Sequence, residues 1–239
     1  MATRGWDVTL IARRTDLVEA NASELRQRGV RALGLACDVT DRSAVAQAVE
    51  RASREIGPID VAVANAGVGV PSHGAKFDIG DAETMIRTNV LGMMYLFSAV
   101  VPSMIERRSG RFVGVASLAG HRGLPATSVY SASKAAMQAF LEANRVDLAP
   151  YGVGVTTVNP GFIVTSMTAK NEFPMPFLMK VEKAARVIAD GIERGKRVVE
   201  FPWPMSLLTR FGRLLPNAVW DRVSAPYGWR KMDAEKMRR

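Results

Sequence analysis

Short runs of consecutive apolar residues alternate along this chain with longer segments in which apolar residues recur every three or four positions. The short runs are typical of buried strands and the longer segments of helices. Strands with two apolar faces, separated by helices, are typical of a parallel sheet covered on both sides. We therefore predict an α/β fold with a doubly wound parallel sheet. The predicted strands are 7–11, 31–36, 60–64, 111–116, 154–158 and 197–201, and the predicted helices are 17–28, 43–55, 81–108 in two or more pieces, 127–149 and 181–193.

The composition is that of an ordinary globular protein. The chain has 239 residues, of which 48% are hydrophobic and 23% charged, and this length suits one α/β domain. Its single cysteine, Cys37, excludes an internal disulfide and a cysteine-based zinc site, so we expect no metal and a reduced, cytoplasmic compartment. The longest apolar stretch, 90–105, is interrupted by Gly92 and Pro102, which favours a buried helix over a membrane span.

The positive charge is concentrated near the carboxyl end. The formal net charge is +9, and residues 180–239 hold 14 Lys and Arg against 7 Asp and Glu. These charges are scattered among apolar residues without a nucleic-acid motif, so we expect no nucleic-acid partner.

Residues 201–239 differ in composition from the rest of the chain. They contain Trp203, Trp220 and Trp229 and an apolar run at helical spacing with Arg210 and Arg213 between its members. We predict a catalytic domain over 1–200 and an extension over 201–239 that packs on this domain or on a second subunit, in a homodimer or homotetramer. A basic amphipathic helix on a membrane surface is the alternative.

Polar and glycine residues directly follow several predicted strands. Ligands of doubly wound sheets bind beyond the carboxyl ends of the strands. Each also has a simpler explanation: Gly67 and Gly161 could serve only turns, Asp38 could only cap the next helix, and Ser117 could be a loop hydroxyl. The residues at these ends are Arg13, Asp38, Val39, Asn65, Ala66, Gly67, Ser117, Pro160 and Gly161.

Tyr130 and Lys134 lie four residues apart in a predicted helix, so their side chains share one face. An ammonium near a phenol favours the phenolate and makes the tyrosine a usable acid or base near neutral pH. Ser117, at the end of the preceding strand, can reach the same face.

Taken in order, these residues resemble the motifs of the short-chain dehydrogenase/reductase family. The resemblance covers 5–201 and rests on Asp38, Asn65-Ala66-Gly67, Asn89, Ser117, Tyr130-Ser131-Ala132-Ser133-Lys134 and Pro160-Gly161-Phe162-Ile163-Val164-Thr165. It implies a Rossmann-like sheet and hydride transfer between a nicotinamide cofactor and a carbonyl or alcohol.

The resemblance also implies catalytic roles. Tyr130 would be the general acid in reduction, and Lys134 would lower the pKa of Tyr130 and hold the nicotinamide ribose. Ser117 would polarise the substrate oxygen, and Asn89 would support Lys134 through water.

The same resemblance implies where a cofactor lies. Asp38 and Val39 would contact the adenine, residues 65–67 would follow the adenosine, and Thr165 would lie near the carboxamide end. Pro160, Gly161 and Ile163 would also bind the cofactor. Ala12 stands where NAD-preferring relatives carry an acid, and Arg13 follows it. A guanidinium suits a 2′-phosphate, so we expect NADP, with NAD as the alternative.

Two departures from the family pattern stand out. Ala64 replaces the first Asn of the usual Asn-Asn-Ala-Gly motif. The family's opening strand and Gly-rich turn have no counterpart, and residues 1–5 resemble the end of the helix that follows them. We therefore expect the native protein to begin upstream of Met1, with a strand and a Gly-rich turn, and the chain as given to bind cofactor poorly or not at all.

The predicted substrate is a mid-sized apolar carbonyl or alcohol, because the loop residues expected to cover the site are mostly apolar. The alternative function is a catalytically silent relative that binds without a working cofactor site. The expected lining residues are Val68, Val70, Phe162, Met167, Phe173, Met175, Phe177 and Leu178.

Overall fold

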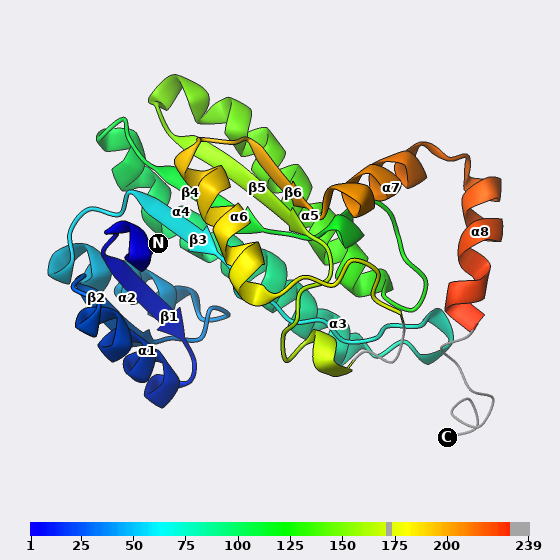
Figure 1. The fold of residues 1–239 in the computed structure, drawn as a ribbon, viewed down its shortest axis with the longest axis horizontal. Coiled ribbons are helices and arrows are strands. Elements are labelled where there is room, and N and C mark those ends of the chain that lie inside the picture. The colour runs from blue at the N-terminus through cyan, green and yellow to red at the C-terminus, as the bar shows by residue number, and fades with distance from the viewer. Residues whose placement is uncertain (171–173, 230–239) are drawn as a thin grey trace.

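The computed structural model describes residues 1–170 and 174–229 and contains two parallel sheets (Figure 1). The first pairs β1 with β2, and the second has the order β3-β4-β5-β6. The α/β fold with a doubly wound, Rossmann-like arrangement is confirmed, and each strand lies within two residues of its predicted range. The strands are β1 (Val8–Ala12), β2 (Ala32–Ala36), β3 (Val61–Ala64), β4 (Arg111–Val115), β5 (Gly154–Pro160) and β6 (Val198–Phe201).

Helices cover both faces of the four-stranded sheet. Phe112 and Val113 are neighbours on β4 and therefore point to opposite faces, and both are fully buried. Phe112 packs with α4 and α5, whereas Val113 packs with α6. The helices are α1 (Thr15–Gln27), α2 (Arg42–Glu55), α3 (Ile79–Ile86), α4 (Gly92–Glu106), α5 (Ser128–Asp147), α6 (Val181–Glu193), α7 (Trp203–Leu214) and α8 (Asn217–Trp229).

The long apolar helical segment is part of the core. It consists of α3, the π-helical turn η3 (Arg87–Leu91) and α4, and by length and composition it could cross a membrane. Its residues Val100, Val101 and Met104 are nevertheless buried in the main hydrophobic cluster. The prediction of a buried helix over 90–105 agrees with this packing.

A gap separates the two sheets. The strands β1 and β3 both line it, and no strand of the described residues pairs with their facing edges. Val63, in β3, is 40% exposed as a result. Beside the gap, Arg4 forms ion pairs with Asp190 and Glu193 of α6, which ties the first residues of the chain to the second sheet.

The segment after β6 forms two helices that extend from the sheet (Figure 1). Arg122 fixes the corner between them: it donates to the carbonyl oxygens of Gly212 and Leu215 and to the side chain of Asn217. The guanidinium of Arg122 also lies 4.8 Å from the ring centre of Trp220. Arg122 thus attaches both helices to the domain through polar contacts.

Candidate active site

The carboxyl ends of the strands open into one cavity of about 2880 Å³. Parallel strands all end at the same edge of a sheet, which brings residues from distant parts of the sequence together. The volume exceeds the usual range for ligand pockets because the cavity is continuous with the gap between β1 and β3. Of the residues expected in the site, Asn89 is not among those that line it; those that do are Arg13, Asp38, Val39, Asn65, Ala66, Gly67, Ser117, Tyr130, Lys134, Pro160, Gly161, Ile163 and Thr165.

Lys134 is held in a buried position on α5. Its Nζ donates a hydrogen bond to the carbonyl oxygen of Val115 at 2.9 Å and lies 5.7 Å from the ring centre of Tyr130. Loss of hydration on burial lowers the pKa of Lys134 to about 8. The ammonium is therefore easier to deprotonate than an exposed lysine.

The phenol of Tyr130 is partly buried beside Ser117. Burial raises the pKa of Tyr130, and a hydrogen bond with the Ser117 side chain partly opposes this. The family resemblance assigns Lys134 the role of lowering this pKa, but in this structure burial outweighs every effect that lowers it. The phenol therefore keeps its proton at neutral pH, as a proton donor must.

Ser117 starts the short helix η4 (Leu118–Gly120). Its Oγ accepts a hydrogen bond from the backbone N–H of Ala119 at 3.1 Å and donates to the carbonyl oxygen of Pro160 at 3.4 Å. The Ser117 hydroxyl thus caps η4, a role that the sequence did not indicate, and Ser117 also lines the cavity.

Asn89 connects the loop after β3 to α5. Its Oδ1 accepts from the N–H of Val68 at 2.8 Å, and its Nδ2 donates to the Val68 carbonyl at 2.9 Å and to Ser133 Oγ at 3.0 Å. A Cβ added at Gly67 would lie 3.3 Å from Asn89 Oδ1 and 3.5 Å from Lys134 Nζ. Asn89 thus positions the backbone at Gly67, where a side chain would crowd both groups.

The opposite end of the cavity is charged and open. Asp38 accepts hydrogen bonds from the backbone N–H of Thr40 at 2.9 Å and from its hydroxyl at 2.8 Å, and these bonds lower the pKa of Asp38. Arg13 Nη1 lies 4.0 Å from Asp38 Oδ2, and the Arg13 side chain is 73% exposed. The guanidinium is therefore free to turn toward an anion.

The prediction of the apolar lining is partly wrong. Phe173 lies outside the described residues, and Met175, Phe177 and Leu178 do not line the cavity. The backbone at Phe177 adopts a positive φ of 58°, and the side chains of Phe177 and Leu178 are exposed. Four predicted residues do line it: Val68, Val70, Phe162 and Met167.

The extension contributes further apolar lining that sequence reasoning missed. Leu208 and Phe211 of α7 and Trp220 of α8 also line the cavity. The helical spacing of 207–215 was visible in the sequence, but nothing in it indicated that the two helices reach the open end of the sheet.

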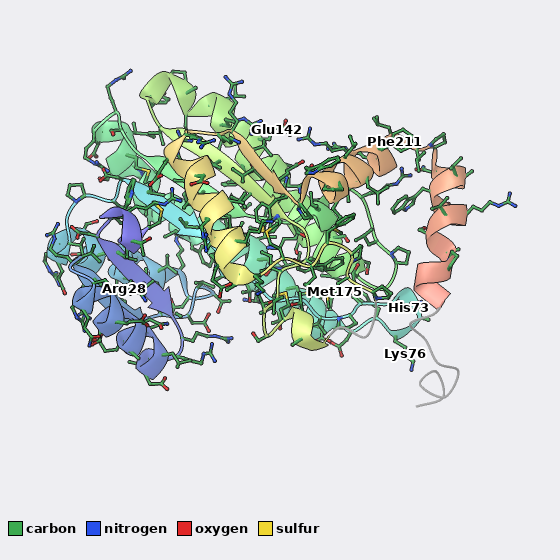
Figure 2. The ribbon with its side chains drawn as sticks, in the orientation of Figure 1. Arg28, His73, Lys76, Glu142, Met175 and Phe211 are labelled. Carbon is green, nitrogen blue, oxygen red and sulfur yellow. The ribbon has the colours of Figure 1, made fainter. Side chains whose placement is uncertain are left out.

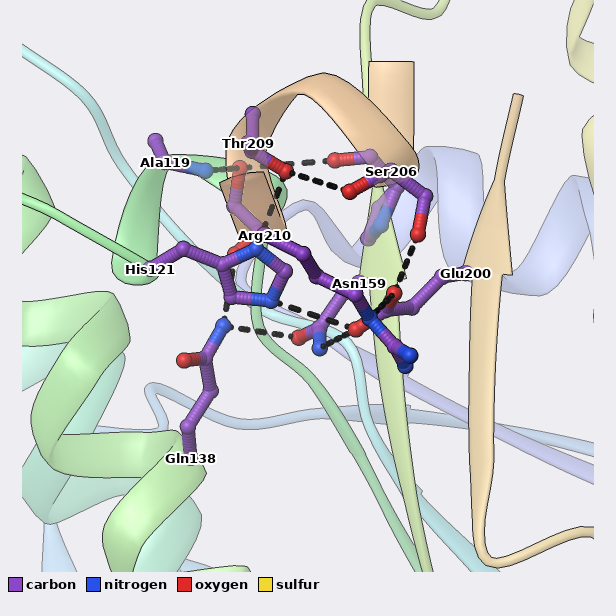
Figure 3. Close-up of polar contacts among 10 residues, drawn as sticks. Ala119, His121, Gln138, Asn159, Glu200, Ser206, Thr209 and Arg210 are labelled. Carbon is purple, nitrogen blue, oxygen red and sulfur yellow. Dashed lines mark hydrogen bonds and ion pairs between the residues drawn. The ribbon is translucent and has the colours of Figure 1, made fainter. Parts of the chain in front are cut away.

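A buried polar cluster around Glu200 also escaped sequence reasoning (Figure 3). Glu200 of β6 accepts hydrogen bonds from Asn159 Nδ2 at 2.9 Å and Arg210 Nε at 2.8 Å, and it bonds to Ser206 and, at 3.1 Å, to His121 Nε2. Burial alone would raise the pKa of Glu200, but these hydrogen bonds lower it to about 2. A glutamate in the otherwise apolar strand Val198–Phe201 was the available signal.

The cluster reaches the backbone of Ser117. Gln138 Nε2 donates to the Ser117 carbonyl at 2.8 Å and to Asn159 Oδ1 at 3.0 Å. Because Asn159 bonds to Glu200 and Glu200 to Arg210, a continuous hydrogen-bonded path joins the loop that carries Ser117 to α7.

Comparison with known proteins agrees with this geometry. The family model for short chain dehydrogenase matches residues 1–174. An uncharacterized oxidoreductase of Myxococcus xanthus is 41% identical over 224 residues, which cover 94% of this chain and 88% of that protein.

Two solved structures share the fold. An alcohol dehydrogenase from the archaeon Thermococcus sibiricus, complexed with 5-hydroxy-NADP, has a TM-score of 0.75 and 25% identity, over 84% of this chain and 86% of its own. An NAD⁺-bound xylitol dehydrogenase has a TM-score of 0.75 and 26% identity, over 84% of this chain and 89% of its own. With the match of the family model over most of the sequence, these similarities show that the chain belongs to the short-chain dehydrogenase family.

Proposed function

We propose that this oxidoreductase transfers a hydride between NADP(H) and the carbonyl or alcohol of a mid-sized apolar substrate. The observation that carries the proposal is the meeting of Ser117, Tyr130 and Lys134 in one cavity, with the phenol held protonated by burial. A carbonyl that accepts a hydride needs a proton donor at its oxygen, and a buried phenol beside a hydroxyl offers one.

The cavity fits the two ends of a nicotinamide dinucleotide. A Cβ added at Gly69 would lie 3.2 Å from the Tyr130 ring. Because glycine has no side chain, a flat ligand can pass close to the backbone at this position. Arg13 and Asp38 stand at the far end. No strand of residues 1–170 and 174–229 lies in the gap between β1 and β3.

The chain's own residues have separable tasks. The bound cofactor supplies or accepts the hydride. Tyr130 Oη transfers the proton to or from the substrate oxygen, and the Ser117 hydroxyl orients that oxygen by a hydrogen bond. The Lys134 ammonium stabilises the phenolate left on Tyr130, because a nearby positive charge favours the ionised phenol.

The choice of NADP rests on Arg13. The two neighbours above are bound to 5-hydroxy-NADP and to NAD⁺, so similarity alone supports either cofactor. Arg13 is mostly exposed at the end of β1, and its guanidinium can pair with a 2′-phosphate that NAD does not have. Ala12 offers no carboxylate to compete for that position.

The apolar substrate rests on the lining. Val68, Val70, Phe162 and Met167 join Leu208, Phe211 and Trp220 around the cavity. A polyol would leave several hydroxyls without partners against such a surface, which costs free energy for each one.

Consumption of NADPH and NADH in the presence of matched ketones and sugars tests the proposal. We expect oxidation of NADPH with apolar ketones at a high cofactor concentration, and loss of this activity in Ser117→Ala. Tryptophan fluorescence titrated with NADPH separates the competing function: a protein that binds a ketone but neither binds nor oxidises NADPH is the silent binding protein. Faster turnover of sugars would contradict the substrate class.

A further inference from the structure

The helix α7 presents an apolar stripe to solvent. Trp203, Leu207, Phe211 and Leu214 are 75%, 63%, 62% and 79% exposed. Their spacing of four, four and three residues places them along one side of the helix. Isolated exposed apolar residues are ordinary in soluble proteins, but four large ones in a row along one helix are not. The packing of this segment on its own domain, one of the two expectations from the sequence, does not cover them.

The opposite side of α7 is firmly attached, so the orientation of the stripe is fixed. Ser206 is buried and bonds to Glu200, and Gly212 is buried under Arg122, which donates to its carbonyl oxygen. Rotating the helix to bury the stripe would break these hydrogen bonds. Figure 2 labels Phe211 on α7, on the far side of the molecule from Arg28, which directly follows α1.

Positive charge accompanies the stripe. Arg210, Arg213 and Arg222 are exposed on α7 and α8. Within residues 202–226 the sequence has one acidic residue, Asp221, and it is also exposed. Over 201–239 the sequence has eight Lys and Arg against three Asp and Glu. A negatively charged partner is therefore favoured over a neutral one.

We propose that α7 docks on an anionic lipid surface, with Trp203, Leu207 and Leu214, which do not line the cavity, inserted among the lipids and the arginines near the headgroups. Amphipathic basic helices with tryptophan have the chemistry for this interface. A second copy of the chain suits the stripe less well, since both copies carry a net charge of +9 and would bring their basic ends together. This docking does not depend on the proposed enzymatic activity.

Sedimentation with lipid vesicles tests the proposal on the whole chain. We expect the protein to sediment with vesicles of phosphatidylcholine containing about 30% phosphatidylglycerol and much less with phosphatidylcholine alone, and salt at about 0.5 M to weaken binding. The triple variant Trp203→Gln, Leu207→Gln, Leu214→Gln should bind at least about tenfold more weakly. None of these three residues lines the cavity.

A matched control carries Leu17→Gln, Val146→Gln and Tyr151→Gln, which remove exposed apolar side chains from α1, α5 and the turn after α5. It should bind vesicles like the unaltered chain. Arg213→Glu should weaken binding, whereas Arg54→Glu on α2 should not. Circular dichroism confirms that each variant is folded.

Three results would overturn the proposal. The unaltered protein could fail to bind anionic vesicles, or the triple variant could bind them as well as the control. The triple variant could also elute from a sizing column, without lipid, as a smaller oligomer than the unaltered protein, which would make the stripe a subunit interface.

Discussion

Lys134 Nζ lies 5.7 Å from the ring centre of Tyr130, one helical turn away on α5. The ammonium is fixed by its hydrogen bond to the Val115 carbonyl, and the phenol is hydrogen-bonded to Ser117. Burial acts on the two groups in opposite chemical directions: it makes the lysine easier to deprotonate and the tyrosine harder. Both shifts favour neutral side chains in the absence of a ligand.

Tyr130→Phe should lower the rate of ketone reduction by about 100-fold or more, because it removes the transferable proton. The affinity for NADPH should change little, since the aromatic ring remains. Steady-state kinetics and fluorescence titration measure the two effects. Tyr151→Phe, at an exposed tyrosine after α5, is the control and should leave both unchanged. A loss of only a few fold in Tyr130→Phe would remove this residue from the proton-transfer role.

The order of elements was predictable because each strand is a contiguous apolar run and each helix has an apolar side. The strands β1 to β6 were found to within two residues for this reason. The cluster around Glu200 was not, since Glu200 bonds to a residue 79 positions away in the sequence. Sequence periodicity also does not show how α7 is oriented after Pro202, so the exposure of its apolar side became visible only in the structure.

The pH dependence of stability should differ between the protein and Lys134→Met. The folded pKa of Lys134 is about 8, below its ordinary value of 10.5. Between these values the unfolded chain binds the proton and the folded chain does not, so stability rises with pH in this window. The free energy of unfolding of the protein should therefore gain up to about 3 kcal/mol relative to Lys134→Met between pH 8 and 10.5.

Urea denaturation at several pH values measures this difference. If the free energies of unfolding of the two proteins changed in parallel between pH 8 and 10.5, Lys134 would be hydrated in solution and would have an ordinary pKa.

Glu200→Gln should destabilise the fold by about 2 kcal/mol at pH 7, because charge-assisted hydrogen bonds to Asn159 and Arg210 are lost. The folded pKa of Glu200 is about 2, below its ordinary value of 4.5. Its stabilising contribution is complete above pH 4.5 and disappears as pH falls toward 2. The two proteins should therefore become equally stable in acid.

The control for this experiment is Glu142→Gln on α5, whose side chain is exposed and lies 3.6 Å from Arg145. It should cost less than about 0.5 kcal/mol. If Glu200→Gln also lowered the free energy of unfolding by less than about 0.5 kcal/mol at pH 7, the polar path between Ser117 and α7 would not stabilise the domain.

Arg13→Ala should raise the KM for NADPH about tenfold and leave that for NADH nearly unchanged, as the lost ion pair involves a phosphate that only NADPH carries. Arg14→Ala, one residue further along, controls for the loss of a positive charge at the same end of the cavity. Equal changes for both cofactors would show that Arg13 does not select between them.

The gap between β1 and β3 should be visible in amide hydrogen exchange. In β1, Val8 N–H donates to the Arg31 carbonyl of the neighbouring strand. Alternation along a strand then directs the N–H groups of Thr9 and Ile11 toward the gap. On β3, Arg111 N–H donates to the Asp60 carbonyl, and the same alternation directs the N–H groups of Val61 and Val63 into the gap.

These four amides should exchange at least about 100-fold faster than those of Phe112 and Val113 in β4, which is paired on both sides. NMR of the uniformly labelled chain resolves them individually. If the four amides were as protected as those of β4, another extended segment would have to pair with both edges in solution, because a hydrogen-bonded strand partner is what gives such protection.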